Sequence, residues 1–75
     1  MEKMIEYIVR NLVNNQDAVT IETTEDNGTN VIHVQVAEED VGKVIGKNGK
    51  IAQSLRTILR SASSKTGKKY ILKIN

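Results

Sequence analysis

The chain has 75 residues, no cysteine, a net charge of +2 at pH 7 and two tyrosines as its only aromatic side chains. One domain over residues 1–75 is therefore expected, with neither a disulfide nor a thiolate metal site. The apolar runs are too short for a membrane span, and the N-terminus lacks the apolar block and cleavage site of a signal peptide. We expect a soluble protein of the cytoplasm.

The charges are distributed unevenly along the chain. Residues 1–40 carry two basic and nine acidic side chains, a balance of 2 − 9 = −7, whereas residues 41–75 carry nine basic side chains and no acidic one. An asymmetry of this kind indicates a polyanion as the partner. The alternative is that the two halves neutralise each other across the fold.

In chain order, the first half predicts a helix and then a β-hairpin. An amphipathic helix is expected over residues 2–14, because apolar residues recur there at steps of three and four. These apolar residues are Met4, Ile5, Ile8, Val9, Leu12 and Val13. Residues 18–25 and 31–36 alternate in the manner of strands. The dipeptide Asn27-Gly28 between them is typical of a hairpin turn.

A short helix is expected next. Three acidic residues, 38–40, precede it, and the first turn of a helix favours negative charge. The spacing predicts that this helix turns Val41, Val44 and Ile45 to the core. It is expected to end near Gly46, because a helix often leaves through a left-handed glycine.

The last elements are a longer helix and a strand. The helix is expected from about Gly49 to just before Gly67, and its apolar stripe is formed by Ile51, Leu55, Ile58, Leu59 and Ala62. Residues 68–74 form the strand, with alternate residues on the core side, namely Tyr70, Leu72 and Ile74. The order αββααβ favours an α+β fold, a three-stranded sheet with three helices packed on one face. The helical crossover before the last strand is compatible with a mixed sheet.

The segment VGKVIGKNGK, residues 41–50, combines glycine, aliphatic and basic residues. The start of the second helix offers unpaired N–H groups and a positive dipole end. Glycine lets a phosphate approach the main chain closely, and Lys47 and Lys50 add positive charge. Val41, Val44 and Ile45 could supply an apolar wall for bases. The combination suits single-stranded nucleic acid, and the alternative is a glycine-rich connector without a ligand.

The run VGKVIGKNGKIAQSLRTIL resembles the signature of a KH domain, with its Ile-Gly-x-x-Gly core, and the order αββααβ resembles the type II form. Over essentially its whole length the chain is most similar to the small stand-alone bacterial KH-domain proteins of the KhpA type, also called YlqC-like. The resemblance implies a type II KH fold. It also implies a non-enzymatic, single-stranded RNA-binding protein that acts as a post-transcriptional regulator or RNA chaperone.

Carried over residue by residue, the resemblance assigns the backbone clamp to Gly46, Lys47, Asn48 and Gly49. The aliphatic pair before the clamp corresponds to Val44 and Ile45, and the basic position after it to Lys50. The variable loop corresponds to residues 65–69, where Lys68 and Lys69 suit an RNA contact. Two positions depart from common KH patterns, Ala52 on the groove wall and Asn48 within the clamp.

Other residues give weaker signals. Arg56 and Arg60 share a helix face; Arg56 is near enough to the loop to reach a phosphate, whereas Arg60 is further away and is not assigned to the site. His33 has no second histidine or cysteine for a metal site. No serine has a visible base partner, so no catalytic residue, metal or cofactor is expected.

Val31 and Ile71 are expected to point away from the core and could form part of a protein interface if they are neighbours. The alternative function is therefore an interaction module. The resemblance implies a homodimer or a heterodimer with a larger, Jag-like KH protein as the assembly. Single-stranded DNA stays open as a ligand, because such a clamp contacts the backbone more than the 2′-hydroxyl groups.

Overall fold

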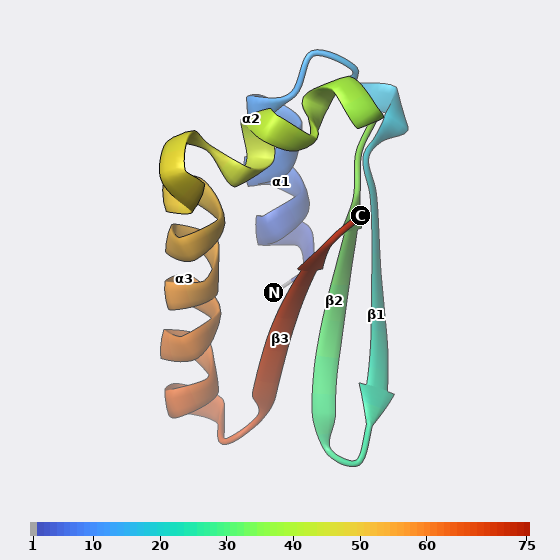
Figure 1. Ribbon diagram of the computed structural model, residues 1–75. Coiled ribbons are helices and arrows are strands. Elements are labelled where there is room, and N and C mark those ends of the chain that lie inside the picture. Colours follow the sequence, from blue (N-terminus) through green and yellow to red (C-terminus); the bar gives the residue numbers. More distant parts are fainter. Residues whose placement is uncertain (1) are drawn as a thin grey trace.

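A computed structural model of the chain describes residues 2–75. The order αββααβ predicted from the sequence is confirmed (Figure 1). The described elements are α1 (Glu2–Leu12), β1 (Thr20–Asp26), β2 (Thr29–Gln35), α2 (Val41–Ile45), α3 (Lys50–Thr66) and β3 (Lys69–Ile74). Single-turn 3-10 helices at Gln16–Ala18, Glu38–Asp40 and Lys47–Gly49 join them.

The sheet is mixed and has the strand order β1-β2-β3. The β1–β2 pair is an antiparallel hairpin in which Asp26 lies opposite Thr29. Its loop is Asn27-Gly28, with φ angles of 51° and 82°, as a two-residue hairpin loop with left-handed central residues requires. The β2–β3 pair is parallel, so the chain must cross over between these strands, and α2 and α3 provide that crossover.

The core lies between the helices and one face of the sheet. Figure 1 shows α1 and α3 on the same side of the strands. The buried apolar residues come from every helix and strand except β1, which contributes the half-buried Ile21, and from the connecting segments. They are Ile5, Val9, Val13, Val19, Ile32, Val34, Val36, Val44, Ala52, Leu55, Leu59 and Leu72. The predicted fold class, α+β with three helices on one face of a three-stranded sheet, is confirmed.

One core prediction is wrong. Ile45 was expected to face the core, but it is 38% exposed, whereas the neighbouring Val44 is fully buried. Consecutive helical residues point about 100° apart, because the period is 3.6 residues. A helix of five residues can therefore bury only one of the two, and Ile45 is left facing outward.

The first two element boundaries also differ from the prediction. The first helix ends at Leu12 rather than at residue 14, although Val13 is still buried. The first strand begins at Thr20, because Ala18 belongs to a 3-10 turn. Among residues 2–75, no helix combines the length and the apolar character that crossing a membrane requires.

Candidate nucleic-acid interface

The loop between α2 and α3 is a tight four-residue turn. The Gly46 N–H donates to the Gly42 carbonyl at 2.9 Å and ends α2, and the Gly49 N–H donates to the Gly46 carbonyl at 3.1 Å. Gly46 has φ 79° and ψ 172°, a backbone region essentially restricted to glycine. Asn48 and Gly49 are both left-handed, with φ 57° and 73°. This succession of conformations turns the chain from one helix into the next within four residues.

The N-terminus of α3 faces the loop without a side-chain partner. Gly49 is its N-cap residue and makes no side-chain capping hydrogen bond, and the first turn contains no acidic residue. Apart from its chain neighbours, no heavy atom lies within 4 Å of the position that a Cβ of Gly49 would take. The Gly49 and Lys50 N–H groups donate to the carbonyls of Gly46 and Lys47, so the open space lies over this turn, at the positive end of a 17-residue helix. Such an end attracts an anion.

Basic side chains flank the open side of the Gly46–Gly49 turn. Lys47 and Lys50 are both exposed. Within residues 2–75, the ion pairs are Arg10 with Glu6 and Lys43 with Asp40. The charges of Lys47 and Lys50 are thus not neutralised by a neighbouring carboxylate, and the loop presents a positive surface.

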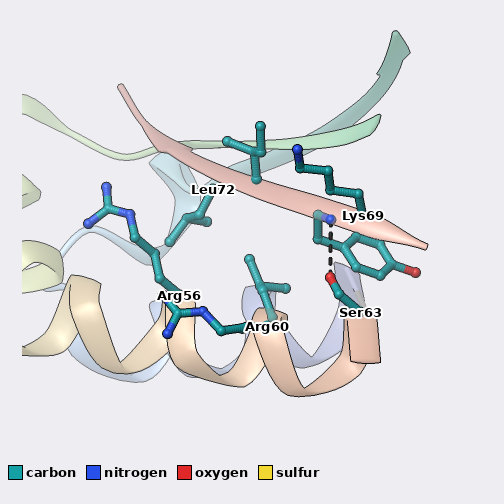
Figure 2. A pocket seen from close by; sticks show the side chains of 8 residues that line it. Arg56, Arg60, Ser63, Lys69 and Leu72 are labelled. Carbon is teal, nitrogen blue, oxygen red and sulfur yellow. Dashed lines mark hydrogen bonds between the residues drawn. The ribbon is translucent and has the colours of Figure 1, made fainter. Parts of the chain in front are cut away.

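A groove lies between α3 and β3 (Figure 2). Its volume is about 340 Å³. The α3 wall consists of Arg56, Leu59, Arg60 and Ser63, and the β3 wall consists of Lys69, Tyr70, Ile71 and Leu72. Apolar side chains thus line the groove beside the two arginines of α3, whereas the Lys69 side chain extends from the face of β3 that points away from α3 (Figure 2). An anionic chain with apolar faces would find both kinds of contact there.

The far end of the groove is held together by one hydrogen bond. The Tyr70 N–H donates to the Ser63 hydroxyl oxygen at 3.2 Å, which joins the first residues of β3 to the last turns of α3 (Figure 2). The hydroxyl lies in the sheet-facing part of α3, because Ser63 is only half exposed. The walls of the groove are therefore joined at this end.

Most of the residues predicted for the site lie along one side of the molecule. Gly46, Lys47, Asn48, Gly49 and Lys50 form the loop and the start of α3. Ile45 offers exposed apolar surface beside them. Arg56 and Lys69 line the groove on its two walls, and Lys68 is exposed in the turn before β3.

Val44 does not belong to this surface. Its side chain has no exposed area and lies in the core cluster. The expectation that it forms an apolar wall for a ligand is wrong, since a buried side chain cannot contact one. Only Ile45 of the predicted aliphatic pair is available.

Part of the groove was not predicted from the sequence. Arg60 is not among the predicted site residues, yet it lines the groove one turn beyond Arg56. Tyr70 is predicted only as a core-side strand residue and Ile71 as part of a possible protein interface, but both form the β3 wall. The available signal was the short connection from α3 to β3, because elements joined by a tight turn lie side by side.

A buried carboxylate lies just before α2. Asp40 has no exposed surface, and it accepts hydrogen bonds from the N–H groups of Asn14 at 3.3 Å and Asn15 at 3.0 Å. The Lys43 ammonium lies 3.4 Å from the same carboxylate. The backbone hydrogen bond from Asn15 lowers the pKa of Asp40 most, the bond from Asn14 and the charge of Lys43 lower it further, and burial acts in the opposite direction. The pKa lies below its usual value of 3.8, so the group is ionised at neutral pH.

The sheet face opposite the helices is open. Val31 lies beside Ile71 in the β2–β3 register, so the two apolar residues noted in the sequence are neighbours. In the adjacent row, Glu22 pairs with His33 and His33 with Lys73. Among residues 2–75, no three histidine, cysteine or acidic side chains are placed to hold a metal ion.

Comparison with known proteins identifies a family. Residues 2–74 match the family model described as "KhpA/KhpB, KH domain". The RNA-binding protein KhpA of Treponema pallidum is 42% identical over 73 residues, which cover 97% of this chain and 91% of that protein. The RNA-binding protein KhpA of Caldanaerobacter subterraneus is 40% identical over 74 residues, 99% of each chain.

One solved structure is also similar. The crystal structure of APE1850 matches with a TM-score of 0.57 and 33% sequence identity, and the match covers 92% of this chain. It covers 49% of that chain, so the present chain spans about half its length.

Proposed function

The chain belongs to the KhpA/KhpB KH-domain family, and we propose that it is a single-stranded RNA-binding protein that holds the RNA backbone at Gly46–Gly49. The proposal is carried by one observation: the N-terminus of α3 has no side-chain cap and no acidic residue in its first turn, and it follows an open glycine turn that exposed lysines flank. A phosphate placed there would be attracted by the positive end of the helix and by the charges of Lys47 and Lys50.

The groove supports the second half of the mechanism. Arg56 lies six residues after Lys50 on α3, about 9 Å along the helix axis. A strand of RNA that leaves the loop along α3 would bring its next phosphates to Arg56 and Arg60. Its bases would lie on the apolar surface of Tyr70. A KH clamp holds four nucleotides of backbone.

The cellular role follows from this chemistry. A protein of a non-enzymatic, RNA-binding family that contacts the RNA backbone acts by occupying or remodelling RNA. We propose a post-transcriptional regulator or RNA chaperone of the cytoplasm. Single-stranded DNA is a competing ligand, because the proposed contacts do not involve the 2′-hydroxyl. Competition between RNA and DNA of the same sequence separates the two.

The proposal is tested by mapping the ligand on the folded protein. Titrating a single-stranded RNA of random sequence into the isotopically labelled protein should shift the amide resonances of Gly46–Gly49 and of the groove residues on α3 and β3. Resonances of the open sheet face, such as those of Glu22 and Val31, should stay in place. Shifts confined to the open sheet face would overturn the proposal.

A second candidate function rests on the open sheet face. The neighbouring Val31 and Ile71, with Ile71 41% exposed, form a small apolar surface without a partner in the fold. In this alternative the domain works mainly as one half of a homodimer, or of a heterodimer with a larger, Jag-like KH protein. Light scattering with and without RNA distinguishes the two functions, because a monomer with full RNA affinity contradicts the interaction-only alternative.

A further inference from the structure

Asp40 is the one charged side chain among residues 2–75 with no exposed surface. Its carboxylate joins two segments that are distant in sequence, since it sits at the start of α2 and accepts from the backbone that follows α1. Burial of an ion is unfavourable unless it is paired and hydrogen-bonded. Here both carboxylate oxygens have partners, so the group acts as a directional link between α1 and α2.

The helix that receives this link has few other anchors. α2 has five residues, and Val44 is its one fully buried side chain, while Val41 is partly buried against the same core. Apolar packing is non-directional. The packing of Val44 therefore fixes the depth of α2 in the core, but it restricts the rotation of α2 about the helix axis less firmly. Hydrogen bonds weaken steeply as they lose alignment. The two bonds from Asn14 and Asn15 therefore restrict the rotation that Val44 permits.

The orientation of α2 determines where the loop lies. The Gly46 N–H donates to Gly42 within α2, and the Gly46 carbonyl in turn accepts from Gly49. Gly46 thus moves with α2, and the turn and the first amides of α3 are linked to it. A rotation of α2 would change the direction in which Lys47 points and the shape of the Gly46–Gly49 turn.

We propose that Asp40 is a positioning residue for the Gly46–Gly49 loop, so that its link to Asn14 and Asn15 sets the affinity for the phosphate backbone without touching it. The inference rests on the proposed function of the loop. Preorganisation of this kind raises affinity by reducing the ordering that binding requires.

The loss of the negative charge at Asp40 would by itself change the RNA affinity in the opposite direction. Asp40→Asn removes a negative charge near a site for a polyanion and frees the Lys43 ammonium, so charge alone would tighten RNA binding. Positioning predicts weaker binding despite the gain in positive charge. Glu39→Gln is the matched control, because Glu39 is the adjacent residue, is exposed and loses the same charge without losing a structural link.

The experiment measures the affinity of a fluorescently labelled random-sequence single-stranded RNA for the wild-type protein, Asp40→Asn and Glu39→Gln. All measurements are made at one temperature that lies below the melting temperatures of the three proteins. We expect Asp40→Asn to bind roughly three- to tenfold more weakly than wild type, and Glu39→Gln to bind equally well or more tightly. If Asp40→Asn is unfolded, an excluded osmolyte is added to all samples until circular dichroism shows the native helix content.

Each outcome is decisive. Equal or tighter binding by folded Asp40→Asn, parallel to Glu39→Gln, overturns the positioning role and leaves the proposed function intact. Lys47→Asp/Asn48→Asp is included in the same series. If wild type does not bind RNA, or if that loop variant binds as well as wild type, the proposed function of the loop fails, and the positioning role fails with it.

Discussion

The side chain of Ile51 fills the space in which a Cβ at position 46 would lie. An ideal Cβ on Gly46 would come within 2.6 Å of Ile51 Cγ1 and within 2.9 Å of its Cβ and Cδ1. Distances below about 3 Å force one group to move. The two glycines of the loop therefore differ in the space beside them. The Ile51 side chain packs against Gly46, whereas Gly49 faces open space.

This difference predicts unequal effects of alanine on stability. Gly46→Ala introduces both an unfavourable backbone region and overlap with Ile51, so we expect a loss of about 2–4 kcal/mol in the free energy of unfolding. Gly49→Ala adds only left-handed strain, about 1–2 kcal/mol. Urea denaturation of both variants checks the order. Equal losses would contradict the account of Gly46.

Arg60 provides a prediction for the groove. Arg60→Gln should weaken RNA binding and reduce the slope of log affinity against log salt by about 0.7, the value for one phosphate contact on a single strand. Arg10→Gln is the control, because it removes the same arginine charge from α1 and Arg10 does not line the groove. Salt titrations of the two variants are compared with wild type. Parallel slopes for Arg60→Gln and wild type would exclude a phosphate contact at Arg60.

Asp40 predicts how stability depends on pH. Its folded-state pKa is lower than the ordinary 3.8, so its contribution is fully present above that value. It decreases as the pH falls through and below 3.8, where the unfolded state takes up the proton first. Asp40→Asn should therefore melt at a lower temperature than wild type at about pH 7, and the difference should narrow towards about pH 3.

Thermal melts of wild type and Asp40→Asn across this pH range make the comparison. Glu39→Gln is again the control, since an exposed neighbour should give a small difference at each pH. A difference between Asp40→Asn and wild type that stays constant from neutral to acid pH would show that the ionised carboxylate is not what stabilises the fold.

Val31 separates the two candidate functions. It lies on the open sheet face and does not line the groove. Val31→Glu should leave RNA affinity within about twofold of wild type, a change of about 0.4 kcal/mol, because Val31 has no part in the proposed RNA contact. Titration and light scattering on the same samples check this. A loss of RNA binding that accompanies dissociation of a dimer would favour the interaction module.

The sequence was sufficient where local signals determine the structure. Asn27-Gly28 predicted the hairpin, because few residues accept two left-handed positions in succession. The helix of residues 50–66 followed from its apolar spacing, and the loop from its two glycines. Each of these features depends on residues close together in the chain, and in each of them the sequence pattern and the fold agree.

Features that depend on distant residues could not be predicted in this way. Asp40 appeared to be a first-turn acid of α2, yet its partners are 26 and 25 residues away, and no pattern indicates such a pairing. The inclusion of Arg60 in the groove required β3 to be placed against α3. The outward direction of Ile45 could not be predicted either, because it follows from the burial of Val44 in a core that distant residues form.

The central claim is that the Gly46–Gly49 loop binds the RNA backbone, and the affinity of Lys47→Asp/Asn48→Asp for single-stranded RNA tests it most directly. The fold should persist, because Lys47 is exposed and aspartate tolerates the left-handed conformation of Asn48. Lys3→Asp/Asn11→Asp on α1 changes the net charge by the same amount. We predict that the loop variant loses at least about tenfold in affinity relative to this control. A folded loop variant that binds RNA as well as the control would contradict the claim.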